Sequence, residues 1–174
     1  MRIRQANVHD VRDIARIHVA SWKSTYKGMI SDEYLSALSI EKRIENWEWV
    51  FNHLNPHEVI YVAENEEGTI IGFANGGKCR SEEFNKYDSE LYAIYILEEY
   101  QGKGSGQALF SSIIKHLQSH DYQSLMVWVL EKNPARTFYS RLGGQVFSQK
   151  DIRMGNETLT ELAMGWSDIN EGMF

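Results

Sequence analysis

A run of alternating glycines is the first feature of this sequence that could do chemistry. Residues Tyr100–Gln107 read YQGKGSGQ and lie between an apolar stretch and a segment with helical periodicity. Such glycines let the backbone turn tightly, so several N–H groups point at one spot where the dipole of the next helix is positive. The pattern predicts an anion site, best suited to phosphate, although a tight strand-to-helix turn alone would need the same glycines.

Two widespread phosphate-binding loops do not fit this run. In the dinucleotide-binding pattern G-x-G-x-x-G, counting from Gly102 places Gln107 at the last position, and counting from Gly104 places Leu109 there. The nucleoside-triphosphate loop also fails, because no glycine-lysine-Ser/Thr run follows four spacer residues. Neither of these two patterns is therefore present in this run.

A second motif begins at Asn133, where the sequence reads NPARTFYSRLGG as far as Gly144. Together with the glycine loop and the strand-like ELYAIYI at Glu90–Ile96, it resembles the GCN5-related N-acetyltransferase (GNAT) superfamily. The loop matches that family's pattern Gln/Arg-x-x-Gly-x-Gly/Ala. The specific residues lie between Glu90 and Gly144, whereas the order of strands and helices resembles the family along nearly the whole chain.

This resemblance implies that the cosubstrate is acetyl-CoA. Its pyrophosphate is then expected on the backbone amides of Gln101, Gly102, Lys103, Gly104, Ser105 and Gly106. Its pantetheine arm is expected to pair with the backbone of Ile94, Tyr95 and Ile96, in a gap where the two strands Leu91–Leu97 and Leu125–Leu130 splay apart. The family's cofactor-contacting asparagine corresponds to Asn133, which also suits a helix N-cap.

Acetyl transfer to an amine needs a base and an acid. An alkylamine with a pKa near 10.4 is neutral in only about one molecule in 2,500 at pH 7, so a base must remove its proton before attack. The leaving thiolate departs more easily if an acid protonates it. The resemblance assigns the acid to Tyr139, which also fits a core aromatic, and it places a base in some members at Glu90. Glu90 would otherwise be a solvated carboxylate, with water relaying the proton.

The acceptor side of the site is predicted at the end of the first helix. Residues 21–26 read SWKSTY and match a run seen in many small-molecule members of the family. Trp22 and Tyr26 are expected to form an aromatic wall that holds a cation, although their spacing also fits ordinary core positions. Acidic residues gather before and within the fourth strand at Glu82, Glu83 and Asp88, which suits an amine cation or simply a wet surface.

The elements that must position these residues can be read from periodicity. Strands are expected at 1–4, 59–63, 70–74, 91–97, 125–130, 146–154 and 158–166, with a hairpin turn at Gly155-Asn156. Helices are expected after the Asn7–Asp10 cap, over 32–52 in two pieces, after the glycine loop, and after Pro134. The order predicts an α/β fold with one mixed, mostly antiparallel sheet of seven strands and four or five helices, in a single domain spanning 1–174.

The composition limits the classes of partner that the protein is expected to bind. The chain has 174 residues, a formal net charge of −6 and a single cysteine, Cys79. The acidic balance argues against binding to a nucleic-acid backbone, and no apolar run approaches the length of a membrane helix. One cysteine cannot form an internal disulfide, so a cytoplasmic location is expected. No metal is expected, because His116 and His120 lack a recognisable third ligand.

These observations together predict an acetyl-CoA-dependent N-acetyltransferase. Direct transfer to a primary amine in a ternary complex is expected, the acceptor being a small molecule or a protein N-terminus. Two alternatives remain from the sequence: a non-catalytic CoA-binding regulatory module, and an NAD(P)-binding oxidoreductase in which Glu131 would contact the ribose. A homodimer is common among members of the family.

Overall fold

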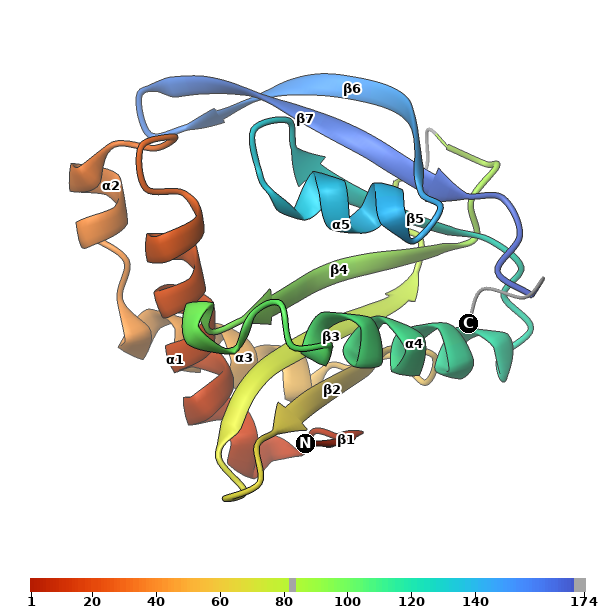
Figure 1. Ribbon diagram of the computed structural model, residues 1–174, viewed down its shortest axis with the longest axis horizontal. Helices are drawn as coiled ribbons and strands as arrows, with labels where there is room; N and C mark the ends of the chain where they lie inside the picture. Colours follow the sequence, from red (N-terminus) through yellow and green to blue (C-terminus); the bar gives the residue numbers. More distant parts are fainter. Residues whose placement is uncertain (82–83, 171–174) are drawn as a thin grey trace.

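The computed structural model describes residues 1–81 and 84–170 (Figure 1). Its strands are β1 (Arg2–Gln5), β2 (Val59–Glu64), β3 (Ile70–Lys78), β4 (Ser89–Ile96), β5 (Leu125–Leu130), β6 (Gln145–Met154) and β7 (Glu157–Trp166). Its helices are α1 (Val11–Thr25), α2 (Asp32–Ser36), α3 (Ile40–Asn52), α4 (Ser105–Gln118) and α5 (Ala135–Arg141), with short 3-10 turns η1 (Val8–Asp10) and η2 (Glu98–Tyr100). The predicted α/β order is confirmed, including the two-piece helical region.

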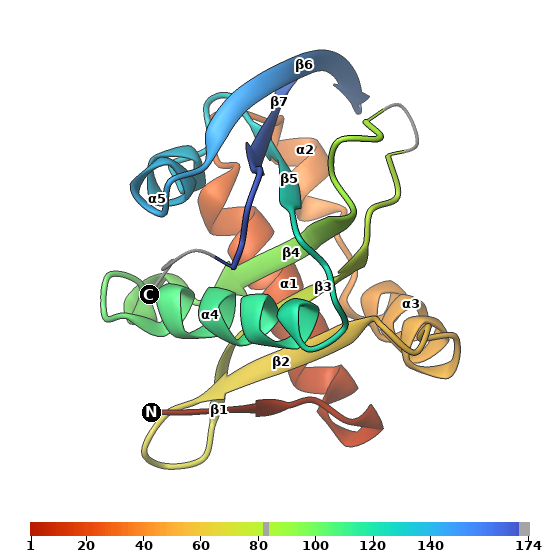
Figure 2. The same cartoon turned by 90° about the vertical axis from the view of Figure 1, so that its right-hand side faces the viewer.

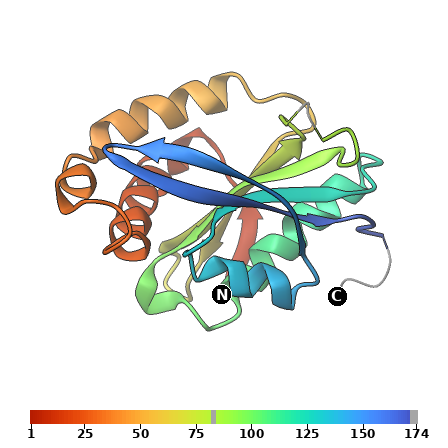
Figure 3. The ribbon, with the colours of Figure 1, turned by 90° about the horizontal axis from the view of Figure 1, so that it is seen from above.

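Within the described residues, seven strands form one mixed sheet in the order β1-β2-β3-β4-β5-β7-β6. Only β4 and β5 run parallel, while the other neighbouring pairs are antiparallel. The parallel pair needs a crossover connection, and α4 supplies it. Seen from above, the β6–β7 hairpin crosses over the strands beneath it, as the twist of a long sheet requires (Figure 3).

Helices cover the two faces of the sheet (Figure 2). On one face, α4 buries apolar side chains such as Leu109 and Phe110 against Val59 and Ala63 of β2. On the other, α1 and α3 pack against alternate residues of the same strand, including Ile60. Period-two alternation therefore sends neighbouring residues of β2 into different cores. No helix of residues 1–81 and 84–170 is both long enough and apolar enough to span a bilayer.

The strands β4 and β5 are paired only along the first part of their length. Their parallel ladder joins Ser89 to Leu125 and ends where Leu91 pairs with Val127. At the same place β4 shifts register against β3, because Tyr92 is an extra residue between the partners of Gly76 and Asn75. Such a bulge bends a strand and increases its twist. Residues 92–96 of β4 are only half-buried because this divergence uncovers them.

Arg4 ties β1 to the start of the helical layer. Its guanidinium donates to both carboxylate oxygens of Asp10, at 2.7 and 2.8 Å, and to Glu64 on β2 at 2.7 Å. Asp10 also accepts from the backbone N–H of Asn7, whose side chain accepts from His9, so the two residues form a capping box. The predicted cap is present, although it opens the 3-10 turn that precedes α1.

Replacing Asp10 by Asn should lower the free energy of unfolding by about 2 kcal/mol at pH 7, the usual range for a hydrogen bond to a charged group. The Arg4 side chain lowers the pKa of Asp10 below its ordinary value. Stability from this group is therefore complete above about pH 4 and is lost as pH falls through the folded-state pKa. Urea denaturation at pH 7 and pH 3 measures the difference, which should shrink at the lower pH.

The matched control is Asp13→Asn, which removes an exposed carboxylate 3.4 Å from Arg16. Exposed pairs contribute little, so its unfolding free energy should stay within about 0.5 kcal/mol of the wild type. Equal losses in the two variants would show that the Arg4 contact has no special weight.

Candidate active site

A cavity of about 290 Å³ lies where β4 and β5 diverge. Its walls come from both strands, from the end of α1, from the start of α5 and from the β6–β7 hairpin. The sequence-predicted residues Trp22, Tyr26, Glu90, Asn133 and Tyr139 all line it, although they come from three separate regions: the end of α1, strand β4, and α5 with the turn before it. The topology therefore gathers the predicted catalytic and acceptor side chains around one space.

The glycine loop closes one end of the diverging strands. Gly102 and Gly104 have positive φ values of 71° and 89°, which L side chains rarely adopt. Gly104 occupies the N-cap position of α4 and provides no side-chain cap, so the first-turn amides of this helix receive no bond from it. Gln101 donates to the Ile96 carbonyl at 3.0 Å, which fixes the loop to the end of β4. This geometry suits an anion at the helix N-terminus.

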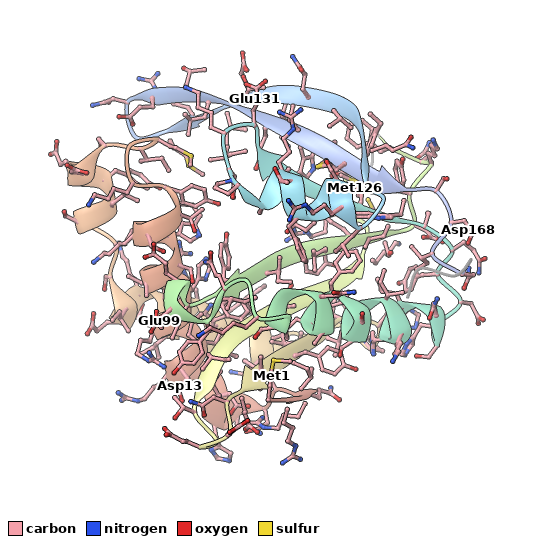
Figure 4. All side chains as sticks on the ribbon, in the orientation of Figure 1. Met1, Asp13, Glu99, Met126, Glu131 and Asp168 are labelled. Carbon is pink, nitrogen blue, oxygen red and sulfur yellow. The ribbon has the colours of Figure 1, made fainter. Side chains whose placement is uncertain are left out.

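Lys103 and Gly106 have local roles in the same loop. The Lys103 ammonium donates to the carbonyl of Glu99 at 2.8 Å, in the turn labelled in Figure 4. A Cβ at Gly106 would lie 3.4 Å from the ring of Phe138, so the glycine permits close packing between α4 and α5. Ser105 is buried, and its hydroxyl contacts the sulfur of Met1 at 3.1 Å.

The predicted cofactor-pairing residues of β4 lie beyond the end of the β4–β5 ladder. Ile94 and Tyr95 line the cavity. The Ile96 carbonyl already accepts from Gln101 and, at 3.4 Å, from the hydroxyl of Ser21. On this side of β4 the backbone of residues 92–96 has no strand partner among the described residues.

Tyr139 lies at the inner wall of the cavity. Its side chain is almost fully buried and packs edge-on against Trp166, with ring centroids 6.1 Å apart. Its hydroxyl makes no hydrogen bond within the described part of the chain. Burial, with a smaller contribution from Tyr95, raises the pKa of Tyr139 well above the usual tyrosine value. The phenol therefore remains protonated at neutral pH and can donate a hydrogen bond into the cavity.

Hydrogen bonds connect Trp22 and Tyr26, the predicted acceptor wall, to Tyr95 and to Asn133 at the start of α5. Trp22 donates from its indole nitrogen to the Tyr95 hydroxyl at 3.0 Å, and the Tyr26 ring packs edge-on against Trp22. Asn133 in turn donates to the Tyr26 hydroxyl at 3.4 Å. Burial raises the pKa of Tyr26 and Tyr95, so both remain neutral. Sequence reasoning gave Tyr95 only a backbone role and missed this side-chain network.

Asn133 has the capping role that the sequence predicted, and its contact with the cofactor stays a prediction. Its Oδ1 accepts from the backbone N–H of Ala135 at 2.9 Å, which caps the first turn of α5. Its Nδ2 points to the Tyr26 hydroxyl on the cavity side. One buried side chain thus orients α5, and with it Tyr139, relative to the acceptor wall.

Glu90 is buried and bound by one basic residue. Arg80 donates to its Oε1 from Nη2 at 2.8 Å and to its Oε2 from the backbone N–H at 2.9 Å and from Nε at 3.4 Å. The guanidinium also lies 3.8 Å from the ring centroid of Tyr92. These bonds stabilise the carboxylate anion and occupy both of its oxygens. The sequence indicated no partner for Glu90.

The remaining acidic residues predicted near the fourth strand do not share one environment. Asp88 accepts hydrogen bonds from the backbone N–H groups of Gln123 and Ser124. It therefore fixes the start of β5 and does not line the cavity. Glu82 and Glu83 lie outside the described residues. Of the described acidic residues of this group, Glu90 lines the cavity and Asp88 does not.

Two cavity residues escaped sequence reasoning. Glu161 on β7 and Trp128 on β5 both line the space. Burial raises the pKa of Glu161, the nearby charge of Glu90 raises it further, and Lys150 opposes this. The available signal was a charged residue beside the apolar run Leu162–Met164, in a strand that otherwise becomes progressively buried.

Comparison with known proteins identifies the family. The sequence profile of the acetyltransferase (GNAT) family matches residues 19–144. An uncharacterized N-acetyltransferase of Bacillus subtilis, YuaI, is 36% identical over 97% of this chain and 94% of its own length. A ribosomal protein bS18 alanine N-acetyltransferase of Haemophilus influenzae is 36% identical over 51% of this chain and 54% of its own.

A solved structure has the same fold. The PaiA N-acetyltransferase of Thermoplasma acidophilum in complex with coenzyme A superposes with a TM-score of 0.72 at 22% identity, covering 94% of this chain and 96% of that one. With the profile match and the full-length relative, the diverging strands, glycine loop and buried tyrosine place this chain in the GNAT family, and it is an N-acetyltransferase.

Proposed function

We propose that the protein transfers an acetyl group from acetyl-CoA directly to a primary amine, in a ternary complex and without an acyl-enzyme. The observation that carries this proposal is the end of the β4–β5 ladder at Leu91 and Val127. Beyond it lies the cavity with Tyr139 in its wall, and Gln101 fixes the glycine loop, at the positive end of α4, to the end of β4. A chain with a phosphate group at one end and a thioester at the other would span these two points.

The glycine loop fits the diphosphate of acetyl-CoA. A Cβ on Gly102 or Gly104 would meet no atom within 4 Å, so the surface there is open as well as conformationally special. The amides at the start of α4 offer hydrogen bonds and a favourable dipole. When bound, acetyl-CoA supplies the acetyl thioester. Loop residues Gln101–Gly106 bind its diphosphate, and the free edge of Ile94–Ile96 binds its arm through backbone bonds.

Tyr139 donates a proton to the leaving sulfur in this proposal. Its raised pKa leaves it a weak acid in absolute terms. The same apolar surroundings also disfavour a bare thiolate, so a hydrogen bond from the phenol strengthens as negative charge develops on sulfur. The proton then passes as the carbon–sulfur bond breaks. The position of Tyr139 between Trp166 and Tyr95 holds the hydroxyl for this task.

Trp22 and Tyr26 form the acceptor wall mainly through their hydrogen bonds. The Arg43 guanidinium lies 5.5 Å from the Trp22 ring centroid, so a cation already occupies one face of that ring. Tyr26 is buried edge-on against Trp22, with centroids 4.8 Å apart. We assign to the pair the positioning of Tyr95 and Asn133, and to the carboxylates of the cavity the attraction of an ammonium ion.

A release assay for free CoA tests the function. The purified protein with acetyl-CoA is offered spermidine, free amino acids, an aminoglycoside and a peptide with a free N-terminal alanine. We expect amine-dependent thiol release with at least one class, and mass spectrometry of the product should show one added acetyl group. CoA binding without release for every amine would favour the regulatory alternative.

Tyr139→Phe should lower kcat about 100-fold or more, the usual contribution of general acid catalysis, while the Kd for CoA changes less than about twofold. The phenyl ring preserves the packing against Trp166, so only the hydroxyl is lost. Steady-state thiol release and calorimetric CoA titration provide the two values. Tyr61→Phe, on β2 and away from the cavity, is the matched control and should retain wild-type kcat. A parallel loss of CoA affinity in Tyr139→Phe would assign the hydroxyl to structure.

Gly104→Val should abolish measurable CoA binding and cost about 1–2 kcal/mol of stability, because a β-branched residue is strained at φ +89° and its side chain fills the anion site. Gly68→Val is the control, since Gly68 has φ +79°, equally open surroundings and a position in the β2–β3 turn. Both variants should show a similar decrease in Tm. If both also keep full CoA affinity, the loop does not bind the diphosphate.

A further inference from the structure

We propose that Glu161 is the general base that removes the proton from the acceptor ammonium. This inference rests on the proposed acetyl transfer to an amine, which requires such a base. The assignment differs from the sequence-based expectation of Glu90, and it follows from the different partners that the structure gives to the two carboxylates.

Two acidic side chains line the cavity among the residues that the structure describes, Glu90 and Glu161. Arg80 engages both oxygens of Glu90 through three donors. A carboxylate bound in this way would have to break an ion pair before it could take a proton. Glu90 therefore serves better as a fixed negative charge and as the anchor that holds Arg80 at the rim.

Glu161 has no comparable partner. Its closest cation is the Lys150 ammonium, whose nitrogen lies 3.8 Å from Oε2, beyond hydrogen-bond distance. Lys150 also lies 3.7 Å from the ring centroid of Trp128, so the aromatic ring holds it as much as the carboxylate does. Within residues 1–81 and 84–170 no side chain or backbone group donates a hydrogen bond to the Glu161 carboxylate, which leaves its lone pairs free for an incoming ammonium ion.

The position of Glu161 is fixed by strand register. It pairs with Leu130 at the end of β5 and with Lys150 on β6. Its side chain shares the wall of the cavity with those of Glu90 and Tyr95. Tyr95 in turn neighbours Tyr139. The proposed base on β7 and the proposed acid on α5 thus line the same cavity, in which the nucleophile would be placed.

The charged surroundings suit a base that works near neutrality. Burial and the Glu90 carboxylate raise the pKa of Glu161, Lys150 from β6 opposes them, and Arg80 neutralises part of the Glu90 charge. A base whose pKa is closer to the working pH accepts a proton more readily. The Glu161 side chain keeps 21% of its surface exposed, which gives the proton a route to solvent.

The protons balance in this scheme. The ammonium ion loses one proton to the Glu161 carboxylate, and the neutral nitrogen forms a bond to the acetyl carbon while the carbon–sulfur bond breaks. Tyr139 gives a proton to the leaving sulfur and recovers one from the nitrogen, which still carries two. The net products are an amide, the thiol of CoA and one proton that Glu161 releases to water.

The experiment compares Glu161→Gln with wild type, using n-propylamine and hydroxylamine as small acceptors. n-Propylamine is almost fully protonated at pH 7, whereas hydroxylamine is mostly neutral. With n-propylamine we expect kcat/KM of Glu161→Gln to fall about 100-fold or more. The kcat/KM of the variant should rise tenfold per pH unit between pH 6 and 9, because the fraction of neutral amine rises in the same way. The kcat/KM of the wild type should instead reach a plateau in this range. With hydroxylamine the two proteins should differ less than about threefold.

Three further variants make the comparison specific. Glu161→Asp should recover part of the rate and the plateau, because it restores a carboxylate. Glu90→Gln should raise KM for the amine but keep the plateau. Glu131→Gln is the control for loss of charge: Glu131 is exposed at the end of β5, beside β6 and β7 at the outer edge of the molecule (Figure 4), and lies outside the cavity. It should behave as wild type.

A second readout needs no catalysis. In protein labelled with carbon-13 at the glutamate carboxyls, the resonance that disappears in Glu161→Gln should titrate above the ordinary glutamate value of about 4.3. Titration at or below that value overturns the assignment, as does an active Glu161→Gln enzyme with an unchanged plateau. A wild type that acetylates no amine contradicts the proposed function itself, whatever the variant does.

Discussion

The divergence of β4 and β5 is the constraint on which the site depends. A parallel pair in the centre of a sheet normally satisfies its backbone groups along its full length, and unpaired buried groups are costly. Here the pairing ends at Leu91 and Val127, beside the bulge at Tyr92. The sheet tolerates this because α4, α5 and the β6–β7 hairpin enclose the opening, and because an extended ligand can pair with the free edge of β4. In the proposed function the arm of acetyl-CoA adds to β4 as a further strand, and this needs no exposed outer edge of the sheet.

Burial determines what the titratable groups around this opening can do. Desolvation raises the pKa of Tyr26, Tyr95 and Tyr139, so all three hydroxyls stay protonated and uncharged at neutral pH. Trp22 and Asn133 donate to the oxygens of the first two, whereas the Tyr139 hydroxyl has no hydrogen-bond partner among the described residues, which leaves it open to a ligand. In surroundings of low dielectric constant each of these hydrogen bonds is stronger than in water, and so is its effect on a developing charge.

Much of the fold was predictable from the sequence because local chemistry determines it. Short apolar runs bounded by turn residues predicted the strands, the glycine loop predicted the start of α4, and Asn133 predicted the cap of α5. The cavity side chains were less accessible, because they depend on pairing between distant segments. The Arg80–Glu90 contact requires the β3–β4 register with its bulge, and Glu161 enters the cavity only because β7 pairs with β5 at Leu130. Periodicity identifies a strand, but it does not identify its neighbour.

The two cations at the cavity explain why its two carboxylates are not equivalent. Arg80 stacks on Tyr92 and Lys150 stacks near Trp128, so an aromatic ring holds each cation. The planar guanidinium also grips Glu90 through two oxygens, a geometry that a single ammonium ion cannot displace without a large penalty. Lys150 is a point charge outside bonding distance of Glu161, and its contact is easily exchanged. An incoming ammonium therefore finds one carboxylate already committed and the other available, so that the choice of base follows from the difference between arginine and lysine.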